Sequence, residues 1–143
     1  MRFRSAEYVE VGPNRIFDNR IHPIDVNLDG PSFFGQSPGA WFNGPLLTSA
    51  TYDAATNSTT IRGRLETNQF VPFIIAFEIQ FFTAAGNGTD QFLGAITITS
   101  PEFEFTARGD LRGRSVIANA IRYRFDELTQ RSTSELGTPI TVQ

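Results

Sequence analysis

From residue 45 onward, the chain is a series of short runs in which apolar and polar residues alternate, and this pattern constrains the fold most. Seven such runs follow one another between turn-forming residues, at 45–53, 59–67, 73–82, 92–100, 101–108, 114–125 and 138–143. Alternation with period two is typical of a half-buried β-strand. No stretch repeats with the period of a helix, and residues 126–131 allow one helical turn at most. The sequence therefore predicts an all-β protein.

Within these runs, apolar residues share one face of each predicted strand and charged residues share the other. In 59–67, Ile61 and Leu65 alternate with Arg62 and Arg64. A strand of this kind buries one face and leaves the other in water. We expect the water-facing sides to form cross-strand ladders of arginine and glutamate, each pair contributing about 0.2–1 kcal/mol. The side chains assigned to these sides are Arg62, Arg64, Glu66, Glu78, Gln80, Glu102, Glu104, Arg122 and Arg124.

Seven short strands separated by turns favour one architecture, an antiparallel β-sandwich of about seven strands. We assign it to residues 45–143, with a loop at 84–91. Hydrophobic residues make up 40% of the chain, including 14 Phe, which is enough core material for folding without metal or disulfide. There is no Cys, so neither a disulfide nor a thiolate site can form.

Residues 1–44 have a different texture and form a separate unit in this interpretation. Residues 1–30 alternate weakly and end in the letters DVNLDG, while residues 31–45 are rich in Pro and Gly and carry several aromatic residues. The sequence predicts an extended segment that resembles one coil of a β-helix, followed by an irregular loop. Because a single solenoid coil cannot bury its own apolar face, this segment needs a neighbour.

The residues that could carry catalysis are few, and the sequence predicts no catalytic residue and no enzyme. The letters GQSPG at 35–39 match a nucleophile-elbow pattern, but Pro38 follows Ser37 and has no N–H for an oxyanion hole. The only histidine, His22, lies upstream of that serine, and there is no lysine for Schiff-base chemistry. A pair of carboxylates such as Glu102 and Glu104 is better explained as the wet face of a strand.

The letters DVNLDG at 25–30 suggest a metal site. Asp25, Asn27 and Asp29 place oxygen ligands at every second residue before Gly30, as calcium loops do. Position twelve of the pattern is Gln36 instead of Glu, so an EF-hand is not expected. A looser calcium site, completed by other loops, remains one interpretation, and an Asx-rich turn is the other. Calcium is the only cofactor that the sequence suggests.

Net charge, the length of apolar runs and short motifs limit the kinds of partner that the sequence supports. A net charge of −3 gives no electrostatic support for nucleic-acid binding, and no run of about 20 apolar residues could span a membrane. The tripeptide RGD at 108–110 is interpreted as an ordinary turn at a strand end. In the aromatic loop, Trp41 and Phe42 could provide a stacking platform for a carbohydrate or another small ligand, although such residues more often anchor a loop to the core.

The order of several segments resembles a module of large bacterial surface and secreted proteins, in which a right-handed parallel β-helix is followed by an immunoglobulin-like sandwich. The matching segments are NRIFDNRIHPIDVNLDG at 14–30, GPLLTSA at 44–50, Gly63 to Leu65, Phe81-Phe82, Phe92 to Gly94 and Thr133 to Leu136. The loop after Phe82 and the linker at 31–44 depart from the family pattern. Calcium binding or loop function therefore does not transfer directly.

The resemblance implies a bacterial, extracellular, non-enzymatic structural or interaction module, secreted or held at the cell surface. Residues 1–30 would then pack on their own sandwich, end a longer β-helix, or join another subunit. We expect the third arrangement, in which the N-terminal segment completes a neighbour by β-augmentation and gives a homo-oligomer or filament. The alternative function is a carbohydrate- or small-ligand-binding sandwich that uses Trp41 and Phe42.

Overall fold

The structure is a computed structural model, and it describes residues 2–3, 25–26, 44–66, 75–86, 88–124 and 131–143. These residues form ten β-strands and no helix. The described residues therefore contain no helix that could cross a membrane. The prediction of an all-β protein is confirmed.

The first sheet is built from three antiparallel strands in the order β3-β4-β7. Its strands are β3 (Leu46–Asp53), β4 (Ser58–Arg64) and β7 (Glu102–Arg108). β3 and β4 form a hairpin, and β7 adds on the other side of β4 with Arg62 opposite Glu104.

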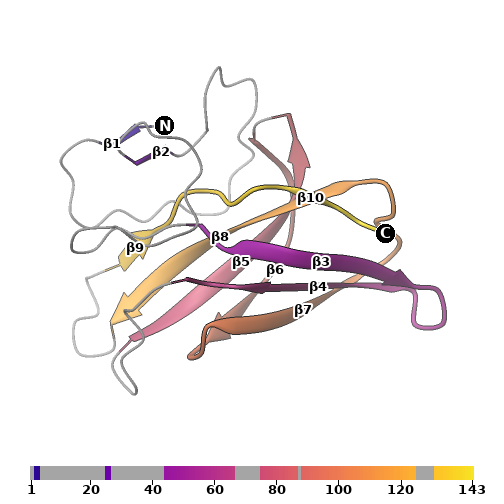
Figure 1. The fold of residues 1–143 in the computed structure, drawn as a ribbon, viewed down its shortest axis with the longest axis horizontal. Coiled ribbons are helices and arrows are strands. Elements are labelled where there is room, and N and C mark those ends of the chain that lie inside the picture. Colours follow the sequence, from indigo (N-terminus) through magenta and orange to yellow (C-terminus); the bar gives the residue numbers. More distant parts are fainter. Residues whose placement is uncertain (1, 4–24, 27–43, 67–74, 87, 125–130) are drawn as a thin grey trace.

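The second sheet contains five strands, again antiparallel, with β10-β8-β5-β6 along its width and β9 also paired with β8. Its strands are β5 (Ile75–Ala85), β6 (Gly88–Ile98), β8 (Ser115–Arg124), β9 (Arg131–Thr133) and β10 (Ile140–Thr141). The two antiparallel sheets pack against each other (Figure 1), and each of the seven runs predicted from the sequence contains a strand.

A third, minimal sheet lies near the N-terminus and pairs β1 (Arg2–Phe3) with β2 (Asp25–Val26) in parallel. In Figure 1 this pair lies toward one end of the long axis, while the C-terminus lies toward the other end. The two ends of the described chain are therefore presented on opposite sides of the molecule.

The hydrophobic core fills the space between the two larger sheets. Phe77, Ile79 and Phe81 of β5 are completely buried and pack in one cluster with Ile61 and Leu65. These are the apolar faces predicted from the alternation, so the choice of face is confirmed for both segments. Burial of side chains of this size contributes about 1.5–3 kcal/mol each.

Aromatic rings connect the two sheets at the centre of the core. The ring of Phe81 in the second sheet stacks on Phe105 of β7, with centroids 4.3 Å apart and planes 8° from parallel. Phe103 meets the same ring edge-on at 5.8 Å. The Phe105 ring needs the space above Gly94, because a Cβ atom there would lie 2.8 Å from its tip. Gly94 also has φ of +147°, a backbone conformation that favours glycine.

The C-terminal segment holds the two sheets together along one side. Ile140 and Thr141 pair with β8, and the Val142 amide donates to the Arg114 carbonyl at 2.9 Å. The next residue, Gln143, exchanges backbone hydrogen bonds of 2.9 Å with Ala50 and Tyr52 of β3. One short segment thus closes an edge of both sheets.

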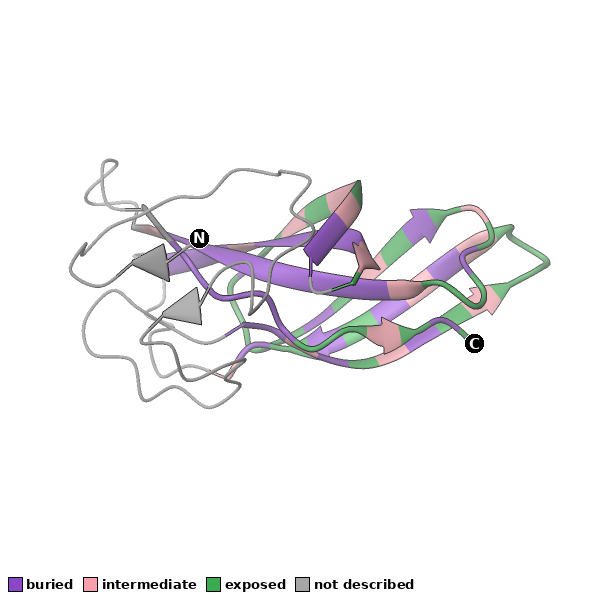
Figure 2. Cartoon of the chain, turned by 90° about the horizontal axis from the view of Figure 1, so that it is seen from above, coloured by how far each residue is buried: buried purple, intermediate pink, exposed green. Residues whose placement is uncertain are grey.

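The second sheet differs from the prediction that each strand leaves one face in water. Residues 116–122 of β8 are all buried, and β5 is buried on both faces over most of its length, as the purple strands in Figure 2 show. Gln80, assigned to a wet face, is only 3% exposed. The faces of β5 alternate as predicted, but its second face is covered as well.

Arg122 was assigned to a water-facing side, and this was wrong. It is 8% exposed and lies directly opposite Phe77 in the β5–β8 ladder. Directly paired residues project from the same face of a sheet. The register therefore places Arg122 on the core side at the rim of the sandwich. The side chain of Arg124 lies outside the described residues.

The loop predicted at 84–91 was also too long. β5 continues to Ala85 and β6 begins at Gly88, so strand pairing extends through Ala84↔Thr89 and Ala85↔Gly88. The small residues Ala, Gly and Thr of this segment give no clear alternation of apolar and polar side chains. The pairing of β5 with β6 nevertheless extends through them.

Replacing Gly94 tests the inter-sheet contact. Gly94→Ala forces a side chain into a strained backbone and against the Phe105 ring, so we expect the free energy of unfolding to fall by about 1–3 kcal/mol. Gly109→Ala is the matched control, since Gly109 has φ of +98° with open space around its Cβ position. Chemical denaturation measures both. An equal loss in the two variants would contradict the steric role of Phe105.

Candidate functional site

The outer face of the first sheet carries the charged ladder that the sequence predicted. Arg62 lies opposite Glu104 and Arg64 lies opposite Glu102 in the β4–β7 register. All four side chains are exposed, so the predicted wet faces of these two strands are confirmed. The first sheet therefore faces water with alternating charge.

Only part of this ladder forms ion pairs straight across the strands. The Arg62 Nε is 2.6 Å from the Glu104 Oε2, whereas the Arg64 Nε is 2.6 Å from the Oε1 of Glu66, two residues along the chain. Glu102 has no ion-pair partner among the described residues. Exposed pairs of this kind contribute about 0–1 kcal/mol each, so their role in stability is small.

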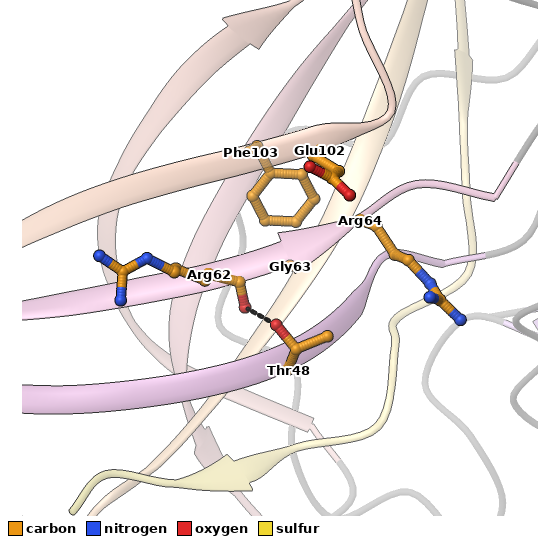
Figure 3. A pocket seen from close by; sticks show the side chains of 6 residues that line it. All are labelled: Thr48, Arg62, Gly63, Arg64, Glu102 and Phe103. Carbon is orange, nitrogen blue, oxygen red and sulfur yellow. Dashed lines mark hydrogen bonds between the residues drawn. The ribbon is translucent and has the colours of Figure 1, made fainter.

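A shallow pocket of about 280 Å³ lies at this ladder. It is lined by Thr48, Arg62, Gly63, Arg64, Glu102 and Phe103 (Figure 3). The Phe103 ring lies over Gly63, where a Cβ atom would be 2.6 Å from the ring. The Thr48 hydroxyl donates to the Arg62 carbonyl at 3.3 Å. The two guanidinium groups are each held by a glutamate, so the pocket offers polar contacts for recognition, with Glu102 as its uncommitted charge.

A second polar group lies on the outer face of the second sheet, where sequence reasoning expected only solvent. Gln80 and Asn119 face each other across β5 and β8, and each is 3% exposed. The Gln80 amide donates to Glu78 at 2.9 Å, and the Tyr123 hydroxyl donates to the other oxygen of Glu78 at 3.3 Å. We call Glu78, Gln80, Asn119 and Tyr123 the outer-face polar strip.

Two acceptors in this strip have no partner among the described residues. They are the Oε1 of Gln80 and the Oδ1 of Asn119. A buried carbonyl oxygen without a hydrogen bond costs about 1–3 kcal/mol, and such atoms are few in folded proteins. The letters AFEIQFF and VIANAI, with isolated amides in otherwise apolar runs, were the available sequence signal.

The RGD tripeptide ends strand β7 and leads into a turn, in agreement with the sequence interpretation. Arg108 is the last residue of the strand, and Asp110 accepts from both the backbone and the guanidinium of Arg112, at 3.0 Å and 2.6 Å. The side-chain hydrogen bond from Arg112 holds the pKa of the Asp110 carboxyl below its usual value. The Arg112 guanidinium also lies 4.5 Å from the centre of the Tyr52 ring. The Asp110 carboxylate is thus committed to a local contact.

The binding residues predicted from sequence fall mostly outside the described residues. This applies to Asn27, Asp29, Trp41 and Phe42, while Asp25 is described only through its backbone in β2. Within the described residues, no group of three or more His, Asp or Glu side chains is arranged to hold a metal ion. Calcium binding by Asp25, Asn27 and Asp29 therefore remains a prediction.

The unsatisfied amide in β8 can be tested by stability. Asn119→Leu removes a buried acceptor and keeps the side-chain volume, so we expect the free energy of unfolding to stay equal or rise by about 1 kcal/mol. Ser134→Ala is the control, because the Ser134 Oγ accepts from the Ala120 amide at 2.9 Å and donates to the Glu135 carbonyl at 2.7 Å. That variant should lose about 1–3 kcal/mol. Equal losses, measured by thermal unfolding, would mean that Asn119 has a partner.

Comparison with known proteins adds no family to these observations. Neither the protein-family models nor the curated proteins include a match to this chain.

Proposed function

We propose that this protein is a non-enzymatic structural and interaction module that assembles with copies of itself or with larger surface proteins through its N-terminal segment. The observation that carries this proposal is the parallel pairing of β1 with β2. Arg2 pairs with Asp25 and Phe3 with Val26, so both pairs join residues 23 positions apart. Repeats of 20–45 residues are the length of one unit in solenoid proteins.

A parallel pair of two-residue strands needs further strands beside it to be stable. Each strand has two residues, and parallel pairing is slightly less stable per residue than antiparallel pairing. A stacked coil gains its core from the coils on either side. The N-terminal pair is therefore suited to continue into a further coil or strand supplied by another chain.

The position of the pair supports assembly in a line. β1 and β2 lie toward one end of the long axis and the C-terminus toward the other (Figure 1). A contact between unlike ends of successive copies is heterologous, and such contacts propagate into filaments or close into rings. We propose this head-to-tail arrangement for the protein.

The immunoglobulin-like identity of the sandwich belongs to the same proposal. The order β3-β4-β7 in one sheet and β10-β8-β5-β6 in the other places the first, second and fifth strands of the sandwich together. Immunoglobulin-like domains group strands A, B and E in one sheet and C, F and G in the other. The resemblance of the sequence segments to modules of bacterial surface proteins supports a secreted or cell-surface location.

A proline in β2 tests the assembly. Val26→Pro removes the amide of that residue and restricts the strand backbone, so we expect the solution mass by light scattering to fall toward that of one chain. Val26→Thr keeps a β-branched residue and should keep the assembly. Because β2 lies outside the two large sheets, the melting temperature of both variants should stay close to that of the parent. A parent protein of monomer mass, or an assembly unchanged by Val26→Pro, would refute the proposal.

The same light-scattering experiment tests whether the assembly depends on calcium. If Asp25, Asn27 and Asp29 hold calcium and the ion orders the N-terminal segment, EDTA should lower the mass of the assembly, and added calcium should restore it. Asp29→Asn, which removes one negative ligand, should weaken the restoration. An assembly that is insensitive to EDTA keeps the assembly proposal and excludes calcium from it.

A further inference from the structure

The open edges of the two large sheets are protected to different degrees. Along one side, the segment Ile140–Gln143 hydrogen-bonds to both sheets, so β3 and β8 meet a neighbour there. Along the other side, β7 ends the first sheet and β6 ends the second. A strand at a sheet edge offers unpaired backbone groups to any other strand, and natural proteins usually guard it with charge, proline or a bulge.

The β7 edge is guarded by charge. Glu102, Glu104 and Arg108 are exposed along its seven residues. A second strand would have to approach between these side chains, which keeps the edge from pairing.

The β6 edge has the opposite character. Over residues 91–98 it contains no charged side chain, and its open side makes no backbone hydrogen bond with the described residues. Gln91, Phe92, Ala95 and Thr97 are exposed, and Phe92, at 46%, is the one large hydrophobic residue in the described chain that is so exposed. Within the described part of the chain, this edge is therefore unpaired and suited to pairing.

The regular part of the edge is short and well defined. From Gly94 to Ile98 each residue of β6 pairs in unbroken register with β5, and the register shifts only beyond Gly94, near Phe92. A new strand can continue the hydrogen-bond ladder only where the edge is regular, because a bulge disrupts the ladder locally. The docking segment is thus residues 94–98, centred on Ile96.

We propose that β6 is a self-association edge, at which two copies of this chain pair antiparallel about a two-fold axis at Ile96. This places Ala95 of each copy opposite Thr97 of the other and joins the two five-stranded sheets into one. The contact does not use the N-terminal segment, so it goes beyond the assembly proposed above and does not depend on it.

Charge favours β6 of a second copy, and not β7, as the strand that pairs with this edge. In the paired stretch 94–98 no charge of either copy meets another, and Asp90 lies outside it, 3.4 Å from Arg114 of its own chain. Pairing with β7 would instead set Glu102 and Glu104 beside an uncharged edge. A two-fold contact also satisfies both open edges at once, as isologous interfaces do. The contact is small, below roughly 1,200 Å², so the dimer should be weak and concentration-dependent.

Charged substitutions at Thr97 test the proposal. In the antiparallel pair the two Thr97 residues are diagonal neighbours, within reach of long side chains. Thr97→Lys and Thr97→Glu should each raise the dimer dissociation constant roughly five- to tenfold, and a one-to-one mixture of the two should restore association. Thr106→Lys on β7, where Thr106 is also exposed, is the control and should change nothing. Sedimentation velocity over a dilution series measures each association.

The experiment is done in the Val26→Pro background, so that head-to-tail assembly does not contribute. Association that is lost in the single variants and regained in the mixture would support the β6 contact, whatever the fate of the N-terminal proposal. A monomer at every concentration, an equal effect of Thr106→Lys, or no recovery in the mixture would overturn it. Binding of a foreign strand without self-association would also overturn it, since the proposed occupant is a second copy.

Discussion

The contact between Phe81 and Phe105 is the interaction on which the rest of the sandwich depends. It joins the centre of the five-stranded sheet to an edge strand of the other, with ring centroids 4.3 Å apart. Gly94 makes it possible, because any side chain there would collide with the Phe105 ring. The same glycine ends the regular part of the β6 ladder, where the register shifts. One close approach therefore fixes the spacing of the two sheets and limits how much of the β6 edge is regular enough to pair.

The two sheets use their outer faces differently. The first carries exposed arginine and glutamate, whose mutual attraction in water is weak. This charged face is suited to remain free of other chains. The second buries Gln80 and Asn119, each with a side-chain oxygen that has no partner among the described residues, a cost that an apolar pair of the same size would avoid. Charge on one face and buried amides on the other make the sandwich asymmetric.

The two proposed contacts lie on different parts of the molecule and differ in kind. The N-terminal pair offers an incomplete parallel ladder at one end of the long axis, and β6 offers an uncharged antiparallel edge along one side. A head-to-tail contact that does not close into a ring propagates into a filament, whereas a two-fold contact closes after two copies. Together they would join linear assemblies side by side. The weakness of a short edge contact suits this role, because many such contacts along two filaments act together.

The sequence by itself determined seven strands of the two large sheets, β3 to β8 and β10, but not β9. It also determined the apolar faces of β4 and β5 and the exposed charge on β4 and β7, because period-two alternation reports directly on which side of a strand meets the core. Its division of residues 1–44 from the sandwich remains a prediction. Only the tertiary structure decided which strands lie in the middle of a sheet, and this is why Gln80 and Arg122 were assigned to water. Alternation describes one strand at a time. Burial of a second face, and the side on which Arg122 falls, depend on the register between β5 and β8, which pairs residues 33 or more positions apart in the chain.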